Sequence, residues 1–292
     1  MRYARVAVGG RAVWARVGYG DADVELLSGC PIEAAGRSGG AAEPSVIGAV
    51  RRAEARWLPP VVPGVFYAVG MNYARHIAHA ASRGDAKAVL PERPEVGYRA
   101  NSALTGHGSP IIRPADVEGR FEAEPELVAV VGRRLRRATY EQARSAVFGW
   151  TIGNDVSART WQHQDRTFWR SKNSDTFKPM GPWIETEVDA LAQTTTLRID
   201  GEPRASFATG AMVFDPFDYL AEISRYITVY PGDVLWMGAE STCQIEPGQT
   251  VDIEISGIGV LSNPVRAEGP EGTVDGRTDA TAARDTERQH QR

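Results

Sequence analysis

Two glutamates stand one residue apart at the start of an apolar stretch. Glu124 and Glu126 precede the run 127–131, whose length and composition predict a β-strand. Because alternate residues of a strand point to the same face, both carboxylates should reach one site. Two converging carboxylates repel unless a cation separates them, and such oxygen ligands suit Mg²⁺, Mn²⁺ or Ca²⁺. The alternative is a solvated pair, and Pro125 fits only a strand start, an edge or a bulge.

A second acidic segment follows the next apolar stretch. Asn154 and Asp155 come after residues 147–152, where a strand should end, and strand ends often carry functional side chains. Locally, the simpler interpretation is an Asx turn, in which one of these side chains binds its own backbone.

Two histidines form a third candidate. His76 and His79 are three residues apart, so a short helix through Ala81 would place them on one face. An imidazole near a metal can act as a general base, since its pKa lies close to neutrality. A zinc site is the alternative, but no cysteine or third histidine has supporting spacing. A histidine of this kind is more often a packing or surface residue.

The elements that must position these residues are mostly strands. Residues 65–69, 127–131 and 251–255 have strand length and apolar character, and Asp200-Gly201 predicts a two-residue hairpin turn. Two helix starts are indicated, by a capping box at Thr139 and Gln142 and by the pair Asp215-Pro216. β-structure should therefore dominate.

The chain divides at two composition changes. Pro59, Pro60 and Pro63 predict a linker, so residues 1–60 form a small N-terminal β-containing domain and 61–266 a catalytic domain. Residues 267–292 have no aromatic, Leu, Ile or Met residue and are expected to be a disordered tail, because they bury too little apolar surface.

Composition excludes several classes of protein. The chain of 292 residues carries 33 basic and 37 acidic residues, so it has no broad cationic field for nucleic acid. It has no apolar run near the ~18 residues of a membrane helix, and Arg5 and Arg11 interrupt any signal peptide. Two cysteines agree with a reducing compartment, and we expect a cytoplasmic protein without a nucleic-acid or membrane partner. Only Lys87, Lys172 and Lys178 are lysines; every other basic residue is arginine.

Taken together and in order, these segments resemble the fumarylacetoacetate hydrolase family over roughly residues 65–265. The motifs that carry the resemblance are GMNYARH, Glu-x-Glu before an apolar strand, GNDVSAR, SKNSDTFKPMGPW, YPGDVLWMG and ISGIGVLSNPV. The resemblance implies a mainly β (α+β) fold, a mixed β-roll or sandwich, and a homodimer.

The resemblance also implies roles for individual residues. Glu124, Glu126 and Asp155 would hold one Mg²⁺ or Mn²⁺ per subunit, with Ca²⁺ as an alternative. Two further residues would be catalytic: His76 would position or deprotonate water, and Lys172 would neutralise enolate charge. The residues that would bind substrate are Arg159, Gln162 and Tyr73.

Two positions depart from the family's pattern. His79 stands where hydrolytic and decarboxylating members commonly have a glutamate that forms a dyad with the preceding histidine. The family's Gly-Thr pair after the PGD hairpin reads Gly238-Ala239, followed by Glu240. Both changes leave the metal ligands intact and affect the reaction and the grip on the substrate's far end.

Three functions are compatible with these residues. The first is hydrolysis of a carbon–carbon bond in an acylpyruvate-like or 1,3-diketo acid through a metal-stabilised enolate. The second is a lyase or isomerase, either a decarboxylase or a keto–enol tautomerase, acting on an oxaloacetate-like 2-oxo acid; the glutamate missing at His79 favours it. The third is a catalytically lapsed homologue that binds a small acid.

Overall fold

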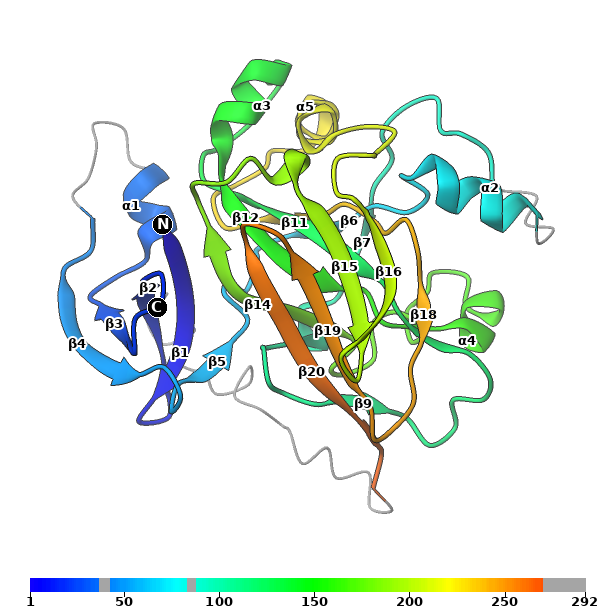
Figure 1. The fold of residues 1–292 in the computed structure, drawn as a ribbon. Coiled ribbons are helices and arrows are strands. Elements are labelled where there is room, and N and C mark those ends of the chain that lie inside the picture. Colours follow the sequence, from blue (N-terminus) through cyan, green and yellow to red (C-terminus); the bar gives the residue numbers. More distant parts are fainter. Residues whose placement is uncertain (37–42, 83–87, 270–292) are drawn as a thin grey trace.

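The computed structural model describes residues 1–36, 43–82 and 88–269, and in this part of the chain strands predominate (Figure 1). Twelve strands form the largest sheet. In spatial order, ten of them are β4 (Val46–Arg51), β3 (Asp23–Leu27), β2 (Arg11–Val17), β1 (Arg2–Val8), β14 (Lys178–Glu185), β12 (Val147–Asn154), β11 (Pro125–Val131), β17 (Val234–Trp236), β6 (Phe66–Ala68) and β7 (Gly97–Tyr98). The other two are β5 (Arg56–Leu58), which pairs with β1, and β8 (Leu104–Thr105), which pairs with β14.

Two smaller sheets complete the β-structure. The five-stranded sheet has the order β16 (Glu202–Ala208), β15 (Thr194–Ile199), β19 (Thr250–Ile255), β20 (Gly259–Ala267) and β9 (Ile111–Arg113). The three-stranded sheet has the order β13 (Ser157–Ala158), β10 (Phe121–Ala123) and β18 (Cys243–Gln244).

The five-stranded sheet packs against the centre of the large one and makes a sandwich (Figure 1). Every residue of β11 is buried, because the strand is covered on both faces. Leu127 and Ala129 enter the core shared with Ile253 of β19, whereas Val128 and Val130 enter a second core on the opposite face. The expected mainly β sandwich is therefore confirmed.

The N-terminal strands continue the large sheet. β1 pairs with β2 and also with β14, with Tyr3 opposite Ile184, and the Tyr3 ring packs on Phe148 of β12. Strands β1 to β5 therefore share a sheet with the strands of the central layer, and the domain boundaries remain a prediction. Residues 270–292 of the expected tail lie outside the described residues, and Ala267 ends β20.

Short helices lie around the sandwich. They are α1 (Pro31–Gly36), α2 (Ala74–Ser82), α3 (Tyr140–Ala146), α4 (Arg159–Gln164) and α5 (Pro216–Tyr226), with 3₁₀ turns η1 (Asn101–Ala103) and η2 (Ala190–Ala192). The capping box of Thr139 and Gln142 opens α3, and Asp215 caps α5 with Pro216 at its first turn, as predicted. Within the described ranges, no helix has the length and apolar character needed to cross a membrane.

The predicted hairpin joins β15 to β16. Asp200 and Gly201 have φ values of 52° and 82°, the positive values that this two-residue turn requires.

Asp233 ties the loop before β17 to the start of β6, and it supports a stability prediction. Its buried carboxylate accepts hydrogen bonds from the backbone N–H groups of Val65 and Tyr230, both at 2.8 Å. Asp233→Ala would leave both donors without this acceptor, and we expect a loss of about 2–4 kcal/mol in the free energy of unfolding, measured in urea. Asp233→Asn keeps one acceptor oxygen and should lose less. An alanine variant as stable as the parent would contradict this role.

Candidate metal centre and active site

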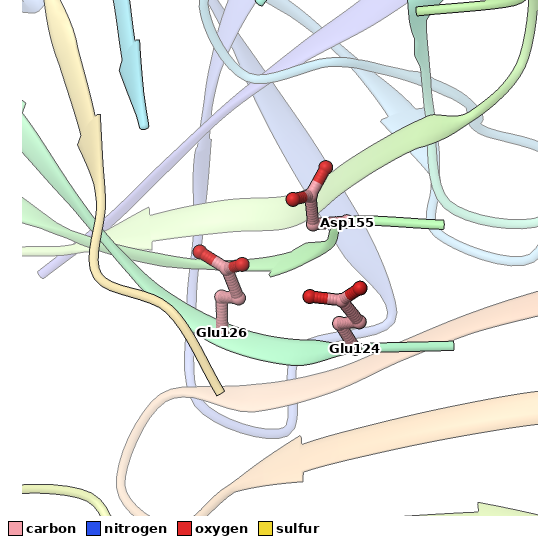
Figure 2. Close-up of side chains that lie close together, drawn as sticks. All are labelled: Glu124, Glu126 and Asp155. Carbon is pink, nitrogen blue, oxygen red and sulfur yellow. The ribbon is translucent and has the colours of Figure 1, made fainter. Parts of the chain in front are cut away.

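Three carboxylates meet where β11 begins and β12 ends. Glu124 precedes β11, Glu126 lies within it, and Asp155 follows β12, whose Asn154 and Gly153 pair with Pro125 and Glu126. One oxygen from each carboxylate lies within 4.8 Å of the others, and all three residues are buried. Figure 2 shows Glu124 and Glu126 rising from the same side of their segment toward Asp155. The strand pattern thus brings the two separate acidic segments together.

Backbone hydrogen bonds hold the carboxylates in place. The Asp155 N–H donates to the Glu124 carbonyl at 3.0 Å, and the Asn154 side-chain oxygen accepts from the Glu124 N–H at 3.0 Å. Asn154 thus uses its side chain to position Glu124, which the local Asx-turn interpretation did not foresee. Glu126 Oε2 accepts from the backbone N–H of Gly238, a residue with φ of 79°, at 2.8 Å.

Three cationic side chains surround Asp155. Lys178 Nζ lies 2.6 Å from its Oδ1 and Lys172 Nζ 2.7 Å from its Oδ2, while the Arg99 guanidinium donates to both oxygens at 3.2 and 2.9 Å. Lys178 also donates to the carbonyls of Val156 and Phe177, and burial lowers its pKa to about 7 although Asp155 favours the charged form. Asp155 is therefore fixed from several sides.

Glu124 shares this positive environment and faces the accessible side. Its Oε1 lies 2.9 Å from Lys172 Nζ and 2.7 Å from Arg159 Nη2, and it accepts from the Ser157 hydroxyl at 2.6 Å. The exposed fraction of the side chains rises from 0% at Lys178 to 7% at Lys172 and 17% at Arg159. The side of the cluster toward Arg159 is therefore its more accessible side.

The charges give the three carboxylates different acidities. Burial alone would raise the pKa of Glu124, but Arg159 and Lys172 lower it to about 2. Burial also opposes ionisation of Asp155, yet Arg99, Lys172 and Lys178 hold its pKa well below the usual value. Glu126 differs: burial and then the charges of Asp155 and Glu124 raise its pKa well above normal. A bound cation would therefore stabilise the ionised form of Glu126 more than that of Glu124 or Asp155.

The donor set fits a hard divalent cation. It consists of carboxylate oxygens alone, it is buried, and it brings together like charges that a cation would stabilise. No sulfur or imidazole belongs to this cluster, so its chemistry favours Mg²⁺, Mn²⁺ or Ca²⁺ over zinc. The residues present therefore fit the metal expected from the sequence, while the identity of the ion stays open.

Comparison with known proteins decides the family. The family model described as fumarylacetoacetate (FAA) hydrolase C-terminal matches residues 65–266. The chain belongs to the fumarylacetoacetate hydrolase family. Members of this family are hydrolases, isomerases and decarboxylases, and the chain is accordingly an enzyme of this family.

Similar proteins in the family have different reaction names. A rat protein named oxaloacetate tautomerase Fahd2a is 31% identical over 230 residues, which cover 74% of this chain and 71% of the relative. The crystal structure of a Mycobacterium smegmatis 5-carboxymethyl-2-hydroxymuconate delta-isomerase has a TM-score of 0.78 and 32% identity, covering 91% of this chain and 100% of that one. A fumarylacetoacetate hydrolase from Exiguobacterium antarcticum has a TM-score of 0.76 and 32% identity, covering 91% and 99%.

The histidine expected in this family site lies on α2, the helix that follows β6. His76 is half-buried on α2, where the charges of Glu124, Arg159 and Lys172 act on it. Burial lowers its pKa and favours the neutral imidazole that a base requires. His79, on the same helix, is exposed. The charge of Glu124 affects the pKa of His76, and the role of this histidine as a base stays a prediction.

The other two expected pocket residues are engaged by the protein itself. Gln162 on α4 accepts a hydrogen bond from Arg159 Nη1 at 2.7 Å. Tyr73 is buried, and its hydroxyl donates to the Thr209 carbonyl at 2.8 Å while its ring packs on Phe207. Their substrate-binding roles in this family member stay predictions.

Sequence reasoning did not assign a role to three charged residues of the site. Arg99 lies two residues before η1 and 56 positions before Asp155 in the chain. No local motif marks it. Glu122 lies two residues before Glu124 and extends the Glu-x-Glu alternation by one step, which is a signal that could have found it. Lys178 was singled out only by the scarcity of lysine.

Proposed function

We propose that the protein is a divalent-metal-dependent enzyme that forms and protonates the enolate of a small 2-oxo acid, most simply as a keto–enol tautomerase of an oxaloacetate-like acid. The observation that carries the proposal is the buried cluster of Glu124, Glu126 and Asp155 with cationic side chains on its accessible side. The rat tautomerase and the mycobacterial isomerase, each above 30% identity, support this choice of reaction.

The side chains of the site would have separate roles in this reaction. Glu124, Glu126 and Asp155 would hold the cation, which when bound withdraws charge from the enolate oxygen. Arg159, beside Glu124, would neutralise the substrate carboxylate, and Lys172, between Glu124 and Asp155, would stabilise the developing charge of the enolate. The neutral imidazole of His76 would take a proton from the carbon next to the keto group and return it to oxygen. No attacking water is needed for this reaction.

Hydrolysis of an acylpyruvate-like or 1,3-diketo acid is the second candidate. It is favoured by the lowered pKa of His76, which suits a base that activates water, and by the fumarylacetoacetate hydrolase relative. It is weakened by the exposed His79, which supplies no carboxylate to orient the imidazole. The two candidates separate in one assay with Mg²⁺, Mn²⁺ or EDTA: faster ketonisation of enol-oxaloacetate supports the first, and release of pyruvate from acylpyruvates supports the second. Neither reaction in the presence of metal would overturn both.

His76→Asn tests the base in either reaction. We expect kcat/KM to fall by about 10²–10⁴-fold, because a positioned base contributes on this scale. In the parent enzyme, activity should fall at low pH as the imidazole becomes protonated, and the lowered pKa places this limb below the usual range of histidine. The asparagine variant should lack that limb. His79→Asn, on the same helix but exposed, is the matched control and should retain activity within about twofold. Equal losses in both variants would contradict the assignment.

A further inference from the structure

A fourth buried carboxylate lies next to the metal centre and has no part in the chemistry described so far. Glu122 is on β10, the central strand of the three-stranded sheet, opposite Ser157 of β13 and Gln244 of β18. Its side chain is only 4% exposed. Among the described residues, no contact joins Glu122 to Glu126 or Asp155, so we look for a role of its charge other than direct metal binding.

Glu122 connects three segments that border the site. Its Oε2 accepts from Arg159 Nε at 2.7 Å and from the Thr242 hydroxyl at 2.9 Å. Its Oε1 accepts from Arg120 Nε at 2.7 Å. Thr242 belongs to the loop whose Gly238 N–H binds Glu126, so the carboxylate joins this loop to the start of α4.

Arg159 is divided between Glu122 and a metal ligand. Its Nε donates to Glu122, its Nη1 donates to Gln162 at 2.7 Å, and its Nη2 lies 2.7 Å from Glu124 Oε1. The guanidinium is a planar fork that prefers to pair both of its nitrogens on one edge with both oxygens of a carboxylate. Here Glu122 holds the Nε, so Glu124 receives a single nitrogen.

We propose that Glu122 is a positioning residue that holds Arg159 beside Glu124 and prevents the guanidinium from closing on Glu124 as a two-pronged pair. With Nε free, the Nε–Nη2 edge would bind both oxygens of Glu124 and compete with a divalent cation for that carboxylate. The same turn would remove the guanidinium from the side on which a substrate carboxylate approaches. The inference rests on the metal-dependent function proposed above and adds a residue to it.

The test is a double-mutant cycle on metal affinity, measured by calorimetry with Mn²⁺ and no substrate. We expect Glu122→Gln to weaken Mn²⁺ binding about tenfold, the scale on which residues behind metal ligands act. In the Arg159→Gln background the same change should alter affinity less than about twofold, because the effect passes through Arg159. An equal loss in both backgrounds, or no loss in either, would overturn the proposal.

Two further variants separate position from charge. Glu122→Asp keeps the charge but withdraws the carboxylate by one methylene group, so it should also weaken Mn²⁺ binding; full affinity would show that charge alone matters and would overturn the proposal. Thr242→Val removes a different hydrogen bond to the same Oε2 and is the matched control, with affinity expected within about twofold. Thermal unfolding of each variant shows that it is folded.

The outcome stays distinguishable if the proposed function itself fails. A parent protein that binds no Mn²⁺ would remove the metal from that function, and crystal structures of the parent and of Glu122→Gln then decide the present inference. Arg159 turned onto both oxygens of Glu124 in the variant would support it. Arg159 in the same place in both structures would overturn it.

Discussion

Glu126→Gln is expected to lower kcat/KM by about 10³-fold while leaving the free energy of unfolding unchanged or higher, since a catalytic cation contributes several kcal/mol to the transition state. Within the described ranges Glu126 forms no salt bridge, and its hydrogen bond from Gly238 can be kept by the amide oxygen of glutamine. The neutral side chain removes repulsion from Asp155 and Glu124 but also removes a charged metal ligand. Steady-state kinetics, Mn²⁺ calorimetry and urea unfolding measure the three quantities.

Two further variants and removal of the metal test the same assignment. Asp155→Asn should lose both metal affinity and stability, because Arg99 and Lys178 would remain buried without their carboxylate and Lys172 would keep only Glu124. Glu185→Gln neutralises another buried carboxylate at the far end of β14 and should leave Mn²⁺ affinity unchanged. Treatment of the parent enzyme with EDTA should reproduce the loss of activity. Full Mn²⁺ affinity in Glu126→Gln would contradict the assigned site.

Lys172→Met is expected to lower kcat by about 10²–10³-fold, the usual cost of removing one group that stabilises developing negative charge. Lys172 Nζ lies between Glu124 and Asp155, and its side chain retains some exposure on the accessible side of the site. Loss of this ammonium removes a competitor for the two carboxylates, so Mn²⁺ affinity should stay the same or increase. Kinetics and calorimetry together therefore separate a role in charge stabilisation from a role in holding the metal.

Lys172→Arg is the informative companion. A guanidinium is a broad planar fork, whereas the space between Glu124 and Asp155 accommodates a compact ammonium at 2.9 and 2.7 Å. We expect little recovery of kcat relative to methionine. Activity of Lys172→Met close to that of the parent would show that Arg159 or Arg99 carries the charge stabilisation instead.

The sequence predicts well those parts of the site that depend on short-range spacing. The common face of Glu124 and Glu126 follows from strand alternation, and the caps of α3 and α5 follow from side chains within three residues of each other. The position of Asp155 followed from the end of an apolar strand, but its approach to the glutamates required the family resemblance, since pairing of β11 with β12 is not a local property.

The surrounding cations were beyond local reasoning for the same reason. Arg99 reaches Asp155 across 56 residues, and Lys178 does so because β14 is the neighbour of β12 in the sheet. Such contacts depend on strand order, which hydrophobic periodicity does not encode. The prolines around residue 60 likewise mark a break in the chain but do not show that β1 pairs with β14 on the far side of it.

The pairing of β1 with β14 bears on the protein's tendency to aggregate through exposed strand edges. β14 supplies Lys178 at one end and Glu185 at the other, and its outer side is paired with β8 near Lys178 and with β1 near Glu185. Unpaired strand edges invite other chains to add to a sheet and aggregate. The sheet continues from β14 through β1, β2 and β3 to β4. Within the described part of the chain, its unpaired edge on this side is therefore β4, three strands away from β1, and not the strand β14 that supplies Lys178 to the site.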